Sequence, residues 1–176
     1  MSAQPETPAE TPGHESEPAT SVAPAFGIDP RSPRFGAGIT AVLLLVVLFL
    51  ALTGLEVAAF VVLLAISLLF AWGAFAGIQR HPYGVLFRAL VRPRLAPPAE
   101  REDPAPPTFA QGVGFVITAL GLVLAALGVP YAVVVAAGLA FVAAFLNSVF
   151  GYCLGCQIYL LLVRAGVIHR SGATAP

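Results

Sequence analysis

Residues 35–53 read FGAGITAVLLLVVLFLALT, a stretch without one charged side chain. A bilayer core about 30 Å thick is crossed by roughly 20 apolar residues in a helix. Three further stretches have the same length and character, at residues 57–77, 109–128 and 131–150. A helix satisfies its own backbone hydrogen bonds where water is absent. We therefore predict an all-α membrane protein with four transmembrane helices.

The composition excludes an ordinary soluble domain. Of the 176 residues, 58% are hydrophobic and only 10% are charged, whereas soluble domains carry about 25% charged residues. Four apolar runs in so short a chain leave too little polar surface to cover a buried helical core. The formal net charge is zero, so we expect no nucleic-acid partner.

The basic residues predict the orientation of the helices. All nine are arginines, and they lie before the first apolar run, between the second and third, or after the fourth. The connections at 53–56 and 128–130 hold none. Cytoplasmic loops carry the excess of Lys and Arg in membrane proteins. We therefore expect both termini in the cytoplasm and two tight hairpins on the other side.

Two motifs occur twice at fixed spacing. The pattern D-P-x-x-P-x-F-x-x-G occurs at residues 29–38 and 103–112, and Y-x-x-L-x-R at 83–88 and 159–164. Similar helix starts can arise from composition alone, but five matched positions favour an internal repeat. We predict two parallel helical-hairpin repeats, residues 29–102 and 103–170, related by a pseudo-twofold axis along the membrane normal.

The remaining segments are polar. Residues 1–28 are rich in Pro, Glu, Ser and Thr and, like residues 171–176, are predicted to be disordered. Residues 82–94, PYGVLFRALVRPR, suit a short amphipathic helix in the membrane interface. Arg88, Arg92 and Arg94 would then lie near anionic lipid head groups. Ordinary positive charge on the cytoplasmic side is the alternative interpretation.

The fourth apolar run carries a stripe of small residues that continues past its end. Its members recur at spacings of three and four: Ala137, Ala140, Ala144, Asn147, Gly151 and Gly155. Small residues let helix backbones approach closely, so Ala140, Ala144, Gly151 and Gly155 are predicted packing positions. Asn147 should hydrogen-bond to a neighbouring helix, through Gln111, Thr118 or a backbone carbonyl.

The only two cysteines, Cys153 and Cys156, lie in FGYCLGCQIY at residues 150–159. At this depth they reach the cytoplasmic interface, where the reducing compartment excludes a permanent structural disulfide. A straight helix would turn both thiols away from the small-residue stripe. A break at Gly151 would instead put them at a helix N-terminus, where the pKa of a thiol falls. The residues alone permit either conformation.

Three interpretations of the cysteine pair stay open: a redox or sulfur-handling dithiol, a metal site, or two structural residues. A structural zinc site needs four ligands, so the pair could bind zinc only if two chains of a homo-oligomer shared their thiolates. Otherwise we predict no cofactor. His81 and His169 are expected to be surface residues at the interface.

Four segments together carry a family resemblance: DPRSPRFGAGITA (29–41), HPYGVLFRALVRPRLAPP (81–98), FAQGVGF (109–115) and AFLNSVFGYCLGCQIY (144–159). The chain resembles an uncharacterised family of bacterial, mainly actinobacterial, integral membrane proteins, the domain of unknown function 4395. The likeness covers residues 29–162. Thr108 stands where the family often has a basic residue, which weakens a charge-based role at that position.

The resemblance implies a multi-pass protein of the bacterial inner membrane without an assigned activity. Genes of the family often lie near thioredoxin-like or sulfurtransferase-like genes, which implies a cytoplasmic partner of that kind. Two hypotheses follow. In the first, Cys153 and Cys156 are a catalytic dithiol supported by Asn147, Gln111 and Tyr159. In the second, the chain is a non-enzymatic membrane scaffold or accessory subunit with structural cysteines.

Overall fold

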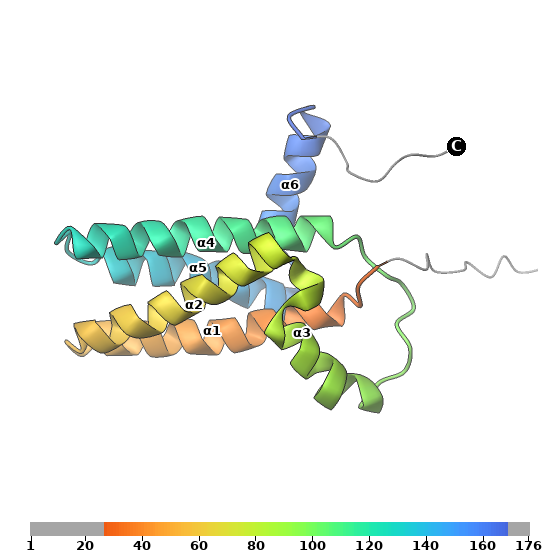
Figure 1. Ribbon diagram of the computed structural model, residues 1–176, viewed down its shortest axis with the longest axis horizontal. Helices are drawn as coiled ribbons and strands as arrows, with labels where there is room; N and C mark the ends of the chain where they lie inside the picture. The colour runs from red at the N-terminus through yellow and green to blue at the C-terminus, as the bar shows by residue number, and fades with distance from the viewer. Residues whose placement is uncertain (1–26, 169–176) are drawn as a thin grey trace, which may run out of the picture.

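The computed structural model describes residues 27–168, and four long helices form an elongated bundle (Figure 1). They are α1 (Arg31–Leu52), α2 (Glu56–Ala76), α4 (Ala105–Ala126) and α5 (Ala132–Phe150). Each is long and apolar enough to cross a membrane, with mean hydropathies of 2.7, 2.5, 2.0 and 2.3. The predicted all-helical fold with four such helices is confirmed.

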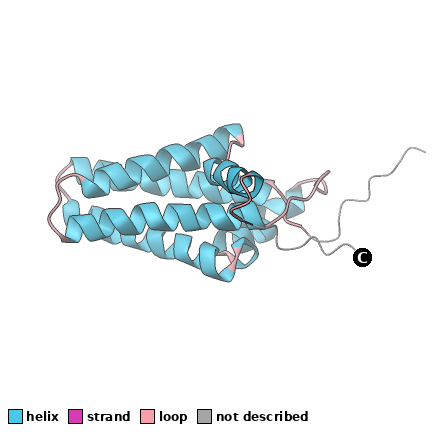
Figure 2. Cartoon of the chain, turned by 90° about the horizontal axis from the view of Figure 1, so that it is seen from above, coloured by secondary structure: helices cyan, strands magenta, loops and turns pink. Residues whose placement is uncertain are grey.

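One short connection joins the two helices of each hairpin, and both connections lie at the same end of the bundle (Figure 2). After α1, the Thr53 hydroxyl donates a hydrogen bond to the Phe49 carbonyl at 2.9 Å. The Leu55 N–H then donates to the Leu50 carbonyl at 2.9 Å, which closes the turn before α2. The second connection, from Leu127 to Tyr131, is two residues longer than the first.

The helix contacts made by the first hairpin correspond to those made by the second. Helix α1 packs on α5 as α2 packs on α4, and the hairpin contact between α1 and α2 is matched by that between α4 and α5. Swapping the two hairpins therefore maps the main helix contacts onto each other. Two parallel repeats would produce this arrangement, although the duplication at 29–102 and 103–170 itself stays a prediction.

The core is narrow and the apolar outer surface is broad. Leu44, Val47, Leu63 and Ala137 have no exposed surface and form the centre of the bundle. Many large apolar side chains point outward instead, including Val57, Phe75, Leu127 and Leu52, which are 70–82% exposed. Soluble proteins rarely expose so much contiguous apolar surface, whereas lipid would cover it.

Two additional segments extend from the end of the bundle opposite the hairpins (Figure 1). One consists of α3 (Pro82–Leu86), a π-helical turn (Phe87–Val91) and a 3₁₀ turn (Arg92–Arg94), and the other is α6 (Leu154–Arg164). The predicted helix at 82–94 is thus present but irregular. Phe87 anchors it, because this ring is 2% exposed and lies 5.8 Å from the Phe35 ring between centroids.

His81 is not the surface residue that the sequence indicated. It is 3% exposed, and its Nε2 lies 3.1 Å from the Leu69 carbonyl oxygen. Its Nδ1 accepts a hydrogen bond from the Tyr83 N–H at 3.3 Å and so caps α3. Burial lowers the pKa of His81 below its usual 6.5. The expectation was wrong because a neutral imidazole can satisfy two backbone groups inside the fold.

The structure describes only part of each end of the chain. Residues 1–26 and 169–176, including His169, lie outside the described residues, so the disorder predicted for 1–26 and 171–176 stays a prediction. Ile28, which we assigned to the tail, exchanges two backbone hydrogen bonds with Glu102, at 2.9 and 3.0 Å. This bridge ties the start of the first hairpin to the linker that precedes the second.

Candidate functional site

The helix that carries the small-residue stripe breaks at Gly151. Helix α5 ends at Phe150, and Gly151 has φ 67° and ψ 18° in the left-handed region. Glycine adopts this conformation without steric cost, which is why it commonly ends helices. The Gly151 N–H donates to the Asn147 carbonyl at 3.1 Å. The structure therefore decides between the two conformations that the sequence left open.

Cys153 is the N-cap residue of α6. Its backbone is extended, with φ −87° and ψ 102°, and its Sγ accepts a hydrogen bond from the Cys156 N–H at 3.3 Å. The first N–H groups of a helix have no partner within the helix. A sulfur at this position meets those N–H groups and the positive end of the helix dipole, both of which favour a thiolate.

The two thiols differ in acidity. A side-chain hydrogen bond from Cys156 is the largest cause that lowers the pKa of Cys153 from 9.0 to about 7, and the N–H groups of Cys156 and Gly155 add to it. The same contact, together with burial, raises the pKa of Cys156. Both cysteines are free and half-buried. At neutral pH Cys153 is therefore the more nucleophilic of the two.

Both cysteines line a cavity of about 410 Å³. Its walls come from the start of α1, the segment before and at the start of α4, and the α5–α6 junction. The lining residues are Pro30, Pro33, Arg34, Glu102, Asp103, Pro106, Pro107, Asn147, Gly151, Cys153, Cys156, Gln157, Tyr159 and Leu160. We expected the thiols to face away from the bundle if the helix were straight. Because the helix breaks at Gly151, both cysteines line this cavity instead.

The structure brings two of the three expected supporting residues to the cysteines. Asn147 and Tyr159 line the same cavity, and the Tyr159 ring packs on Phe109 with centroids 5.6 Å apart. Gln111 does not join them, because its side chain packs against Gly73 of α2. Within residues 27–168 the Asn147 side chain makes no hydrogen bond to Gln111, Thr118 or a backbone carbonyl, so the expected bond to a neighbouring helix is not formed. The Thr118 hydroxyl donates instead to the Gly114 carbonyl at 2.9 Å.

One comparison with known proteins identifies the family. The family model described as Domain of unknown function (DUF4395) matches residues 28–164. The chain belongs to the DUF4395 family. No curated protein and no solved structure matched the chain. The matched range of this DUF4395 chain contains all four long helices, both cysteines and the whole of α6.

In this DUF4395 chain the small-residue stripe is divided between two helices. Ala140 is buried in the core, and Ala144 packs against it. Gly155 lies against α4, where a methyl group would come within 2.5 Å of the Ala110 Cβ. Gly151 lies beside the guanidinium of Arg34. These small residues therefore serve contacts within the chain.

The sequence did not single out Arg34 or Glu102 as site residues. Both line the cysteine cavity, and Glu102 acts against the lowering of the Cys153 pKa. Arg34 lies within the repeated D-P-x-x-P-x-F-x-x-G motif, and Glu102 directly precedes its second copy. The motif was therefore a signal for residues near the site, although it was interpreted only as a helix start.

The metal hypothesis gains no ligand set from a single chain. Within residues 27–168, no three His, Cys, Asp or Glu side chains gather where they could hold a metal ion. A thiolate-bound metal shared across a homo-oligomer stays a hypothesis.

The three expected interfacial arginines of the DUF4395 chain, Arg88, Arg92 and Arg94, are exposed. Arg88 donates from Nη1 to the Gln79 carbonyl at 3.3 Å, and Arg94 donates to the Leu90 carbonyl. They belong to the segment that extends from the same end of the bundle as α6 (Figure 1). Contact with lipid head groups stays a prediction.

Proposed function

We propose that this membrane protein performs thiol–disulfide exchange through Cys153 and Cys156 with a cytoplasmic partner. The observation that carries the proposal is the position of Cys153 as N-cap of α6, beside a cavity that Cys156 also lines. Helix N-terminal cysteines with a lowered pKa are the reactive ones in dithiol proteins. A thioredoxin-like or sulfurtransferase-like protein is the partner that we expect from the family resemblance.

The exchange proceeds in two balanced steps. The Cys153 thiolate attacks one sulfur of a partner disulfide, forms a mixed disulfide and releases the second partner sulfur as a thiolate. Cys156 then loses its proton and attacks the Cys153 sulfur, which releases the first partner sulfur. The partner gains two electrons and becomes a dithiol, while Cys153 and Cys156 become a disulfide. A second partner dithiol reverses these steps and restores the pair.

The raised pKa of Cys156 suits the second role. Cys156 stays protonated while Cys153 attacks, so only one sulfur acts as the first nucleophile. Once the Cys153 sulfur is in a mixed disulfide, its negative charge is gone. The contact that raised the pKa of Cys156 is then weakened, and Cys156 becomes easier to deprotonate.

The proposed location is the bacterial inner membrane with both termini in the cytoplasm. Arginines on one side of the four helices support this orientation. The arginine-bearing segment and α6 extend from the same end of the bundle (Figure 1), which agrees with one cytoplasmic face for both. Labelling of the thiols by a membrane-impermeant reagent in sealed vesicles of known orientation tests it, and labelling from the outer face alone contradicts it.

Trapping of the intermediate tests the chemistry. Cys156→Ser leaves the nucleophile without its resolving partner, so a mixed disulfide with the partner should accumulate. Cys153→Ser is the matched control and should trap nothing, because Cys156 has the raised pKa. Equal trapping by both variants, or by neither, contradicts the proposal.

A non-enzymatic scaffold is the second candidate function. It is favoured by the observation that the Cys153 sulfur caps α6, which is a structural role that a serine hydroxyl also fills. In that case Cys153→Ser combined with Cys156→Ser should leave thermal stability and assembly unchanged and the cell's thiol balance undisturbed. Homo-oligomerisation stays a proposal for either function.

A further inference from the structure

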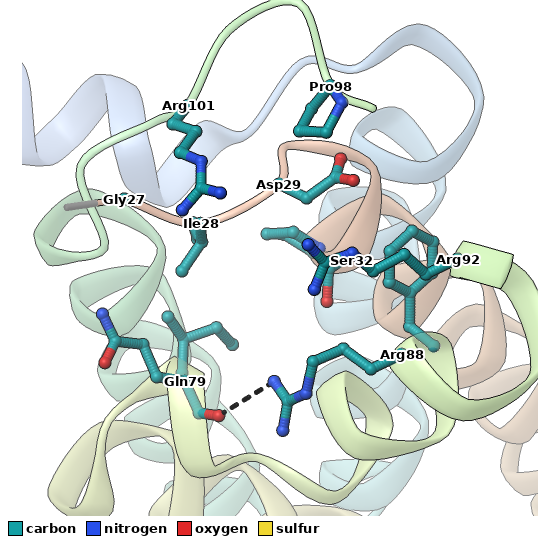
Figure 3. A pocket seen from close by; sticks show the side chains of 12 residues that line it. Gly27, Ile28, Asp29, Ser32, Gln79, Arg88, Arg92, Pro98 and Arg101 are labelled. Atoms are coloured by element: carbon teal, nitrogen blue, oxygen red, sulfur yellow. Dashed lines mark hydrogen bonds between the residues drawn. The ribbon is translucent and has the colours of Figure 1, made fainter. Parts of the chain in front are cut away.

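A second cavity, of about 340 Å³, lies at the end of the bundle that carries α3 and α6 (Figure 3). It forms where the start of α1, the 3₁₀ turn after α2, the segment after α3 and the linker before α4 meet. Pro33 is the one residue that it shares with the cysteine cavity. Its chemistry is therefore separate from that of the thiols.

Positive charge predominates among the described residues that line this cavity. Arg88, Arg92 and Arg101 supply three guanidinium groups, and Asp29 supplies one carboxylate. Asp29 is already neutralised, because Arg31 donates to both of its oxygens, from Nε at 2.9 Å and from Nη2 at 2.7 Å. Three like charges around one cavity repel one another, and an anion would relieve that repulsion.

The Arg88 guanidinium and the linker that carries Arg101 are held in place by contacts with other segments. Arg88 enters the cavity from the side opposite Arg101 and donates from Nη1 to the Gln79 carbonyl (Figure 3). Both ends of the linker that carries Arg101 are fixed. Arg31 Nη2 donates to the Ala96 carbonyl at 3.0 Å, and Glu102 pairs with Ile28. The cavity therefore does not require a large rearrangement before a ligand binds.

Each guanidinium keeps donors for a ligand. An arginine has five N–H donors, and Arg88 uses one of them on the Gln79 carbonyl. The planar fork of a guanidinium matches the spacing of two phosphate oxygens. A volume of about 340 Å³ lies at the lower end of the range for small-ligand sites, about 300–1,000 Å³.

We propose that this cavity binds a phosphate-bearing anion through Arg88, Arg92 and Arg101. Two sources present that chemistry: the head group of an anionic phospholipid, and a free phosphate compound of the cytoplasm. Arg88 and Arg92 belong to the segment expected in the membrane interface, so both sources can reach the cavity.

Binding to the purified full-length chain in maltoside detergent tests the proposal. Phosphatidylglycerol is added and bound lipid is counted by native mass spectrometry. Inorganic phosphate is titrated in a parallel thermal-shift experiment at matched ionic strength. Arg88→Gln combined with Arg101→Gln should weaken binding by about tenfold or more for each guanidinium removed.

Arg80→Gln combined with Arg164→Gln is the matched control. It removes the same charge from the same end of the bundle, but neither side chain lines the cavity. Its affinity should stay within about twofold of wild type. If the cavity variant does not fold, Arg101→Gln alone replaces it, because this side chain lies exposed on the linker.

The outcomes separate the sources. Specific binding of phosphatidylglycerol alone supports the proposal with a lipid head group, and binding of inorganic phosphate alone supports it with a soluble anion. An equal loss of affinity in the cavity variant and the control overturns it, because diffuse charge would then explain the binding. Absence of binding by both ligands overturns it as well.

Discussion

The backbone N–H of Cys156 donates a hydrogen bond to the Sγ of Cys153 across 3.3 Å. The C-x-x-C spacing makes this contact possible, because it places the backbone N–H of the second cysteine where it stabilises the sulfur of the first. Without the break at Gly151, the Cys156 N–H would bond to a helix carbonyl instead.

The first prediction concerns the pH dependence of alkylation. Only a thiolate reacts with iodoacetamide, so the rate at Cys153 should reach half its maximum near pH 7, the pKa to which the site lowers it. Cys156 should react more slowly across the neutral range, because its pKa is raised. Residue-resolved mass spectrometry of full-length protein measures both rates. In the unfolded chain both midpoints should move to about 8.5, and a shared midpoint in the folded chain would contradict the prediction.

Gly151→Ala should destabilise the junction between α5 and α6. A residue with a Cβ costs about 1–2 kcal/mol in the left-handed conformation, and the Arg34 guanidinium occupies the space that the methyl group would need. Thermal unfolding in detergent measures the effect. Gly138→Ala is the control, since nothing lies within 4 Å of its added methyl group, and in a helix alanine should stabilise by about 0.5–1 kcal/mol. Equal melting temperatures for the two variants would refute this account.

Gly155→Ala should loosen α6 from α4. Its methyl group would lie 2.5 Å from the Ala110 Cβ, and overpacking of this kind costs about 1–3 kcal/mol. Faster hydrogen exchange in α6, compared with that in α2, reports the change. Gly112→Ala serves as the control on α4, because its nearest neighbour, the Ala74 Cβ, is 3.9 Å away. Unchanged exchange in α6 of the Gly155 variant would contradict the packing described.

His81 should make stability fall in mild acid. Its folded-state pKa is lowered below 6.5, so the unfolded chain binds the proton first, and stability rises with pH in this range. The contribution is fully present above pH 6.5 and is lost as the pH falls through and below that value. Melting temperatures between pH 7.5 and 5 measure it.

His81→Gln should remove this pH dependence at the cost of lower stability at neutral pH. Glutamine does not gain a proton in this pH range. Its flexible side chain, however, does not hold the two ring nitrogens' positions that contact the Leu69 carbonyl and the Tyr83 N–H. An identical pH slope in the variant and in wild type would show that another group is responsible.

Much of the fold was predictable because hydropathy acts locally. Residues 35–53 and their three counterparts became the helices α1, α2, α4 and α5, with bounds that differ by a few residues. The helices of membrane proteins form from runs of apolar residues whatever their neighbours are. The prediction of Gly155 as a packing position depended in the same way on a residue type, since only glycine fits so close to Ala110.

The site was less predictable, because it depends on residues far apart in the sequence. The sequence offered Gln111 as one possible partner of Asn147, but in the structure the Gln111 side chain packs against Gly73 of α2. His81 was assigned to the surface because no sequence pattern revealed the two backbone groups that it satisfies. Arg101 received no role, since its approach to Arg88 follows from the bridge between Ile28 and Glu102.

By itself the sequence determined an all-helical chain with four helices that can span a membrane, two cysteines beyond the last of them, and arginines on one side. Only the tertiary structure decided that the helix breaks at Gly151, that Cys153 caps α6, and that three arginines surround a cavity. The physical reason is that these effects act over different separations along the chain. Hydropathy adds along consecutive residues, whereas caps, cavities and pKa values depend on distances that folding alone establishes.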